Sequence, residues 1–191
     1  MNVSRSDLIL AESTGDVPAL QHSLDADNPS IRILALGSLD RVRALTEDNI
    51  RTALLDPDRD VRCRAIEVSI QRTPIGLTGL LGDADDLVVE TAAWALGERE
   101  DGSPETVAVL SLVGTTHEIS ICREAAIAAL GAIGSDAGLP AILAGLEDRA
   151  PVRRRAVLAL APFDTPEVAL ALERATKDRD RQVRQAAEDL L

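Results

Sequence analysis

A ten-residue pattern recurs six times along this chain, and it constrains the fold more than any other feature. The copies begin at Ile31, Val61, Val88, Cys122, Val152 and Val183. Each copy has alanine at its fifth position, and five of the six have arginine at the second. Successive copies start 27 to 34 residues apart. Self-similarity at this period is typical of solenoids, in which one repeat is one supersecondary unit and neighbours stack into a continuous core.

Each copy follows a helix-start signal and, in most cases, an acidic turn. The start signals are Asp16, Thr46, Thr73-Pro74, Ser103-Pro104, Ser135-Asp136 and Thr165-Pro166. Ser, Thr and Asp side chains accept from free backbone N–H groups at a helix N-terminus, and proline fits the first turn. Turns such as Asp56-Pro57-Asp58 then separate two helices. The sequence therefore predicts an all-α fold, an α-solenoid of about six helical hairpins.

We expect one repeat domain over residues 1–191. The predicted repeats are approximately 16–42, 45–72, 73–99, 103–134, 135–163 and 164–191. A short helix over 4–13 matches no copy, so we interpret residues 1–15 as an N-terminal cap helix. The sixth position is apolar in five copies and Glu188 in the last, as expected of a terminal repeat.

Composition limits the function classes. The net charge is -12, which disfavours nucleic acid as a partner because that polyanion binds basic surfaces. Cys63 and Cys122 are far apart and form no CxxC motif, so neither a disulfide scaffold nor a zinc site is expected. The N-terminus shows no secretion signal, and no apolar run has the ~20 residues of a membrane helix. We expect a cytoplasmic protein that uses neither membrane nor nucleic acid; the oligomeric state stays open.

The pattern V-R-x-x-A-x-x-x-L-G after an Asp-rich turn resembles HEAT repeats of the phycobilisome-lyase (PBS lyase) subclass. The segments beginning at Cys122 and Val152 carry it most clearly, and the resemblance spans roughly residues 17–191. It implies a right-handed superhelix of HEAT-like hairpins. It also implies that the second-position arginines pair with aspartates of adjacent turns, such as Asp58, Asp85 and Asp180. These structural arginines are Arg32, Arg62, Arg123, Arg153 and Arg184.

A residue advances about 100° on a helix, so positions one, five, eight and nine share a core-facing side. Positions three and seven point away, toward the concave face of the resembling fold. There the middle copies place an apolar strip with a charged margin: Trp94, Ala128 and Leu158 beside Glu90, Glu124 and Arg154. We predict a partner-binding site at these residues. The alternative is that Trp94 folds down and fills space in a core that is poor in aromatic residues.

Catalytic chemistry finds little support. Deoxyhypusine hydroxylase has similar repeats and binds iron through repeated His-Glu pairs, whereas this chain has only His117-Glu118, in a turn, and His22. Alkylpurine DNA glycosylases need a basic groove, which the acidic balance does not favour. Cys63 takes an outward-facing position beside Arg62 and Arg64, where it is either reactive or an incidental surface cysteine. We expect no catalytic residues, no metal and no cofactor.

The sequence thus predicts a non-catalytic scaffold or adaptor that presents a concave acidic and apolar surface to a protein partner with a basic segment. Two other classes stay open: a lyase-like subunit that handles a bound chromophore or cofactor, and a structural subunit of a larger assembly. A deep pocket near Trp94 would favour the lyase-like subunit. An apolar convex or end surface would favour the structural subunit.

Overall fold

Every regular element of the computed structural model is a helix within the residues that it describes, 3–72 and 74–191. These residues divide into two units, Met1–Gly76 and Leu77–Leu191. The division falls inside the segment predicted to begin the third hairpin. Among the described residues, no helix is both long enough and apolar enough to cross a membrane.

The first unit consists of one helix that belongs to no hairpin, followed by two helical hairpins. Its helices are α1 (Arg5–Thr14), α2 (Val17–His22), η1 (Ser23–Asp25), α3 (Pro29–Arg41), α4 (Glu47–Ala53) and α5 (Arg59–Ser69). α1 packs against α2 and α3, and α3 packs against α5. A bidentate ion pair ties α1 to α3: Arg41 donates from Nε and Nη2 to the Glu12 carboxylate, both at 2.6 Å.

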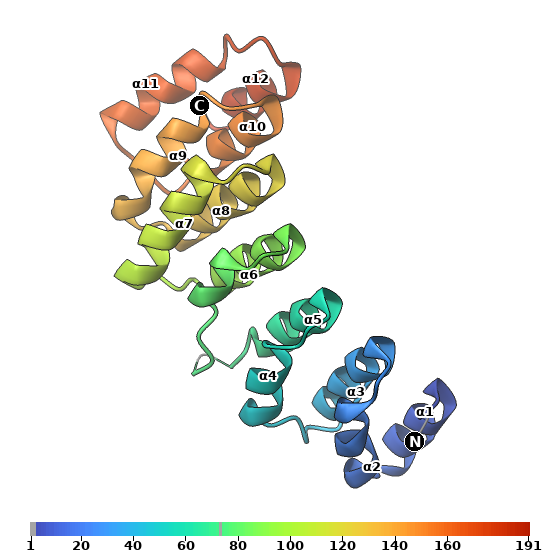
Figure 1. Cartoon of the computed structure of the whole chain (residues 1–191). Helices are drawn as coiled ribbons and strands as arrows, with labels where there is room; N and C mark the ends of the chain where they lie inside the picture. The colour runs from blue at the N-terminus through green and yellow to red at the C-terminus, as the bar shows by residue number, and fades with distance from the viewer. Residues whose placement is uncertain (1–2, 73) are drawn as a thin grey trace. The chain divides into compact units, whose positions relative to one another are not determined.

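The second unit forms two rows of helices (Figure 1). Its elements are η2 (Thr78–Gly82), α6 (Asp86–Glu98), α7 (Pro104–Thr116), α8 (Ser120–Ile133), η3 (Asp136–Gly138), α9 (Leu139–Gly145), α10 (Ala150–Ala159), α11 (Pro166–Ala175) and α12 (Arg181–Glu188). α6, α8, α10 and α12 pack one against the next, and α7, α9 and α11 form the other row. A helix of the second row and the helix that follows it in the first row form a helical hairpin, as in α7 with α8, α9 with α10, and α11 with α12.

In most hairpins, the first helix begins at a side-chain N-cap that the sequence predicts. Asp16 accepts from Ala19 N–H, Ser103 from Thr106 N–H and Thr165 from Val168 N–H. Thr46 forms a reciprocal capping box with Asn49. These caps satisfy backbone donors that have no partner inside the helix.

The third and fifth hairpins depart from the prediction. Ser135-Asp136 opens a 3-10 turn, and the α-helix begins only at Leu139. In the third hairpin, Thr73 lies outside the described residues, and the expected first helix is the five-residue 3-10 helix Thr78–Gly82. Gly76, Gly79 and Gly82 punctuate this segment, and each glycine costs about 1 kcal/mol in an α-helix relative to alanine.

The core positions of the pattern are buried throughout. The fifth-position alanines Ala35, Ala65, Ala92, Ala126, Ala156 and Ala187 are all fully inaccessible to solvent. The first position is buried in every copy, and the sixth is fully buried in every copy but the last, where Glu188 is exposed. An α-carbon substituent no larger than methyl at position five lets the neighbouring helices approach closely.

Two glycines set how closely the second helices stack. Gly97 ends the pattern on α6, and a Cβ added there would lie 2.9 Å from the Ala129 Cα of α8. Gly131 takes the same place on α8, where an added Cβ would lie 2.6 Å from the Ala159 Cβ of α10. Each contact joins the tenth position of one copy to the eighth of the next. The glycines therefore fix the distances between α6, α8 and α10, on which the candidate site is built.

Arginines at position two connect successive turns. Arg123 donates from Nε and Nη2 to the Asp148 carboxylate at 2.6 and 2.8 Å, and its Nη1 donates to the carbonyl oxygens of His117 and Glu118. Arg153 makes the same two-point contact with Asp178, and Arg32 makes it with Asp56. The planar guanidinium suits this geometry because it donates two parallel bonds to a carboxylate.

The aspartates in these pairs differ from those we expected. Asp56 and Asp178 hold the arginines, whereas Asp58 and Asp180 accept from backbone N–H groups as the N-caps of α5 and α12. Asp85 likewise caps α6 through Leu87 N–H. Asp56 and Asp178 each lie two residues before these N-caps, and they contact the arginine of the preceding copy. Arg62 and Arg184 each donate to two carbonyl oxygens of their own turns.

Candidate functional site

The outward side of α6 carries the residues predicted to bind a partner. Trp94 lies at the centre of this helix and keeps 46% of its surface exposed. It therefore does not fold down into the core. Glu90 and Glu98 lie four residues before and after it, which places all three side chains on one face. The preceding residue, Ala93, is fully buried in the core, so Trp94 lies on the other side of the helix.

A hollow of about 370 Å³ lies beside Trp94, between α6 and α8. Its walls are Glu90, Trp94, Gly97, Glu98, Ile121, Glu124, Ala125, Ala128, Ala129, Ala132 and Arg155. The small alanines of α8 form an apolar floor, and three carboxylates stand at its margin. The structure thus places the predicted residues Trp94, Glu90, Glu124 and Ala128 around one depression.

Leu158 borders a second hollow, between α8 and α10. Ala128, Ala132 and Arg155 line both hollows, so the two are continuous along one face of the unit. Leu158 is 38% exposed at the pattern's seventh position, the position that Trp94 takes on α6. The sixth predicted residue, Arg154, is exposed but lines neither hollow.

Charges at the margin are already partly paired. The Arg155 guanidinium lies 3.3 Å from the Glu124 carboxylate, across the gap from α10 to α8. Arg155 and Glu98 are functional candidates outside the six predicted site residues; Arg155 belongs to the basic triplet Arg153-Arg154-Arg155. The four-residue spacing of Glu90, Trp94 and Glu98 was a signal for one of them. For Arg155, helical phase alone gave none, since its side chain reaches the face only by extending toward Glu124.

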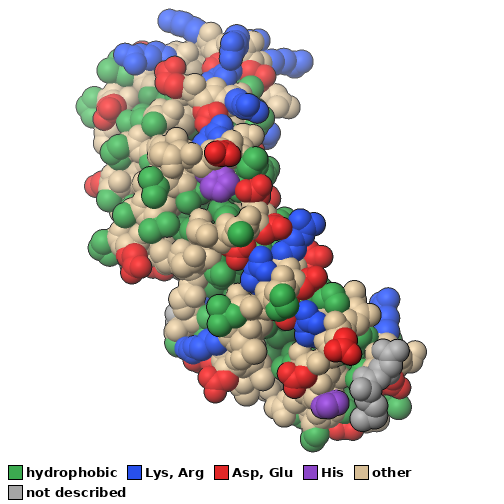
Figure 2. Space-filling view, in the orientation of Figure 1, with side chains coloured by type: hydrophobic (Ala, Val, Ile, Leu, Met, Phe, Trp, Pro, Cys, Tyr) green, Lys and Arg blue, Asp and Glu red, His purple; other side chains and the backbone are tan. Residues whose placement is uncertain are grey.

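Figure 2 shows how charge is distributed on one face of the molecule. Basic side chains gather at the end of the second unit that holds α11 and α12, and acidic side chains are spread more widely. A hollow of about 490 Å³ lies at that end, and Arg153 and Asp178 are among the residues that line it. These two groups form an ion pair with each other. They belong to the series of arginine–aspartate pairs between successive turns, called the arginine–aspartate ladder below, and are not free to bind a ligand.

Cys63 does not face solvent as we expected. It is buried, at 9% exposure, although it takes the same third position as the half-buried Glu90. Neighbouring side chains cover it in the first unit. The expected outward-facing placement of Cys63 is therefore wrong, and a covered thiol is a poor nucleophile toward reagents in solution.

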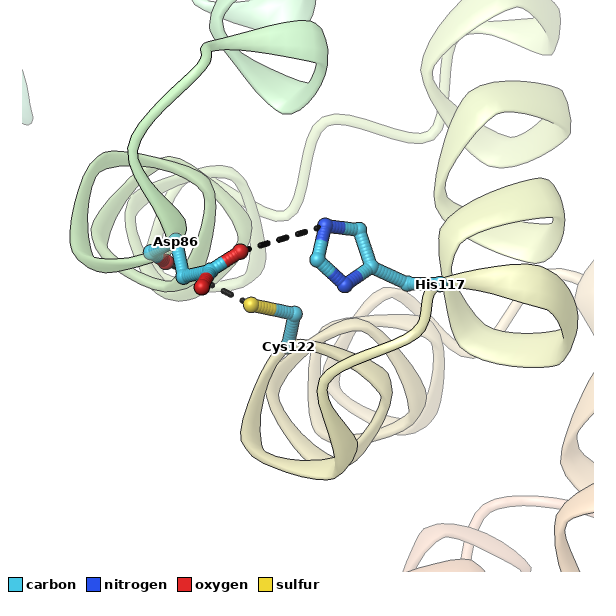
Figure 3. A group of neighbouring side chains, drawn as sticks. All are labelled: Asp86, His117 and Cys122. Atoms are coloured by element: carbon cyan, nitrogen blue, oxygen red, sulfur yellow. Dashed lines mark hydrogen bonds and ion pairs between the residues drawn. The ribbon is translucent and has the colours of Figure 1, made fainter.

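A cluster that the sequence interpretation missed joins α6, α7 and α8. Asp86, His117 and Cys122 bring potential metal-ligating atoms within 4.8 Å of one another (Figure 3). His117 Nε2 lies 3.8 Å from the Asp86 carboxylate, and the Cys122 thiol donates to the Asp86 carbonyl oxygen at 3.4 Å. Burial, followed by the charges of Asp86 and Glu90, raises the pKa of the Cys122 thiol to about 11. The free thiol is therefore protonated at neutral pH.

The fold and the outward face define an all-α repeat protein built from stacked helical hairpins. Residues 115–191, from the end of α7 through α12, match the family model of HEAT repeats. This match supports HEAT repeats in that part of the chain. HEAT repeats commonly serve as protein-interaction scaffolds and are generally non-enzymatic. A search of curated proteins found no match.

Proposed function

We propose that this protein is a non-catalytic scaffold that holds a basic segment of a partner protein along the face of α6, α8 and α10. One observation carries the proposal. Trp94, the only tryptophan in the chain, stands half-exposed beside an apolar floor in a hollow that Glu90, Glu98 and Glu124 also line. An exposed indole surrounded by carboxylates is the chemistry that recognises a Lys or Arg side chain.

The energetics favour a cation on Trp94. A guanidinium or ammonium over an indole face gains about 0.5–2 kcal/mol, depending on how far it is desolvated. Its aliphatic stem would lie on the alanines of α8 while its charged head meets the carboxylates. The net charge of -12 also speeds encounter with a basic segment and makes the rate sensitive to salt.

Apolar contacts would supply the rest of the affinity. Leu158 lies at the far end of the continuous face, and Ala128 lies between it and Trp94. A segment lying along this face would bury the side chains of Leu158 and Ala128, which gains roughly 25 cal/mol of binding free energy per Å² of apolar surface. The buried ladder and the glycine contacts make this part of the fold rigid, so little ordering of the scaffold is required.

The same proposal takes the repeats to belong to the phycobilisome-lyase subclass. The arginine and alanine pattern supports this, together with the two-point arginine–aspartate contacts between turns. For a subunit that handles a chromophore, the hollow beside Trp94 would instead hold that chromophore.

The test uses the fluorescence of Trp94, which reports from the proposed site alone because the chain has no other tryptophan and no tyrosine. The protein is titrated with peptides of one length in which leucine alternates with basic, neutral or acidic residues. We expect the basic peptide to bind at least tenfold more tightly than the other two, with an affinity that falls as salt rises. Equal binding of the acidic peptide would refute the proposal, and quenching by a tetrapyrrole alone would favour the chromophore-handling alternative.

Two charge-matched variants separate local from global electrostatics. The double change Glu90→Gln and Glu98→Gln removes two carboxylates beside Trp94. The control, Glu105→Gln and Glu118→Gln, removes two exposed carboxylates outside the hollow and alters the net charge equally. We expect only the first variant to weaken the basic peptide at least fivefold; equal weakening by both would show a nonspecific charge effect and contradict the proposed site.

A further inference from the structure

The arginine–aspartate ladder is replaced at one junction, where α6 meets α8. Position two of the copy on α6 is Val89, the only copy without arginine. The turn that follows α7 starts with His117, five residues before Cys122, where Asp56 and Asp178 stand five residues before Val61 and Val183. Both members of one arginine–aspartate pair are therefore replaced: Val89 stands at the arginine position and His117 at the aspartate position.

His117 keeps the local duty of the aspartate that it replaces. Asp56 accepts from Asp58 N–H and Asp178 from Asp180 N–H, two residues ahead. His117 Nδ1 accepts from Ile119 N–H at 3.2 Å in the same way. The other imidazole nitrogen, Nε2, is left facing Asp86, and the buried Cys122 lies beside them.

Cys122 also departs from its pattern. The first position is an aliphatic residue in the five other copies, namely Ile31, Val61, Val88, Val152 and Val183. A thiol is therefore not required there for packing. Asp86, which lies beside Cys122, is the first residue of α6. The carboxylate of α6, the imidazole that follows α7 and the thiol of α8 therefore lie together. These are the three side-chain types that bind Zn²⁺.

We propose that Asp86, His117 and Cys122 bind a divalent transition-metal cation of the Zn²⁺ class and that this metal bridges α6, α7 and α8 in place of the missing ion pair. The ligands would be the Asp86 carboxylate, His117 Nε2 and Cys122 Sγ. A fourth position would remain for water or for a group of a bound partner.

The protons balance in a simple exchange. The Cys122 S–H bond breaks, its proton leaves to solvent, and a sulfur–metal bond forms. The cation lies among the carboxylates that raise the pKa of the free thiol, so their effect is offset once it binds. His117 moves its proton from Nε2 to Nδ1, which releases Ile119 N–H; that group lies on an exposed turn where water can replace the bond.

The experiment measures cation binding to the full chain after treatment with chelator. Zn²⁺ is titrated by calorimetry, and Co²⁺ serves as a spectroscopic probe because a thiolate ligand gives a sulfur-to-cobalt charge-transfer band. Two variants remove ligands with little structural cost. Cys122→Val restores the residue of four other copies, and His117→Asn keeps a side-chain acceptor for Ile119 N–H. Cys63→Ala, in the first unit, is the control for the other cysteine.

We expect one cation per chain, loss of the charge-transfer band in Cys122→Val, and at least tenfold weaker binding in both site variants. Cys63→Ala should bind like the wild type. The proposal is overturned if the wild type binds no Zn²⁺ at millimolar concentration, if both site variants bind as tightly as the wild type, or if the band survives in Cys122→Val. Thermal unfolding of each variant, without metal, shows that all are folded.

Discussion

Val89 and His117 occupy, at the junction of α6 and α8, the two positions at which Arg123 and Asp148 form a two-point ion pair one junction further along the chain. The exchange leaves a valine that is fully buried and a histidine that still closes its turn. A ladder of repeated charge pairs therefore contains one differently built step. That step adjoins the face that carries Trp94.

Rebuilding the ladder at this step should reveal coupling between the two positions. Val89→Arg alone should destabilise the protein by roughly 2–4 kcal/mol, because it buries a cation without its carboxylate. Adding His117→Asp should recover about 1–3 kcal/mol of that loss. Urea unfolding of the wild type, both single variants and the double variant measures the coupling free energy. Additive effects, within about 0.3 kcal/mol, would show that the two positions do not face each other as the ladder residues do.

The existing rungs should matter for stability rather than for binding. Arg123→Ala removes two bonds to Asp148 and leaves that carboxylate and two carbonyl oxygens without their donor, so we expect a loss of about 2–4 kcal/mol. Arg154→Ala, at the exposed third position of its copy, should change stability by less than about 0.5 kcal/mol. Denaturant midpoints check both. If Arg123→Ala weakened the basic peptide while leaving stability intact, these arginines would be ligand-binding residues.

The stacking distance of the second helices should depend on Gly131. In Gly131→Ala the new methyl would lie 2.6 Å from the Ala159 Cβ and 2.7 Å from its Cα, so α8 and α10 must separate. We expect a net loss of about 1–3 kcal/mol despite the better helix propensity of alanine. Gly79→Ala is the control, because an added Cβ there meets nothing within 4 Å. A thermal scan in which both variants behaved alike would contradict the close contact.

Acid should loosen the contact between α1 and α3. Hydrogen bonds from Arg41, and then from Ser38, lower the pKa of Glu12 from its ordinary 4.5 to about 2. A carboxylate with a lowered pKa stabilises the folded state above its unfolded pKa, and this contribution disappears as the pH falls from about 4.5 toward 2. We expect the amide protection factors of α1, which correct for the pH dependence of intrinsic exchange, to fall over this range.

Glu12→Gln is the comparison for this effect, because it removes the titrating group but keeps a similar shape. The stability difference between wild type and variant should be largest above pH 5 and shrink as the pH falls toward 2. A difference that stays constant with pH would show that the Glu12–Arg41 contact does not contribute through ionisation.

Much of the architecture was predictable from the chain alone. The pattern located the second helix of every hairpin. The angle between residues on one helix then assigned the buried positions, such as the alanine at position five. The first helix of the third hairpin was not predictable by the same rule. Its Thr73-Pro74 start resembled the others, but three glycines in the following segment favour a 3-10 turn over an α-helix.

The sequence by itself determined the period of the repeat, the helical hairpins and the outward direction of Trp94, because these depend on the angle between residues on one helix. Only the tertiary structure decided which aspartate each arginine meets, that Arg155 reaches Glu124, and that Asp86, His117 and Cys122 converge. These relationships join different helices, so they depend on how closely the helices pack. That distance is set by contacts such as Gly131 against Ala159, which no single helix encodes.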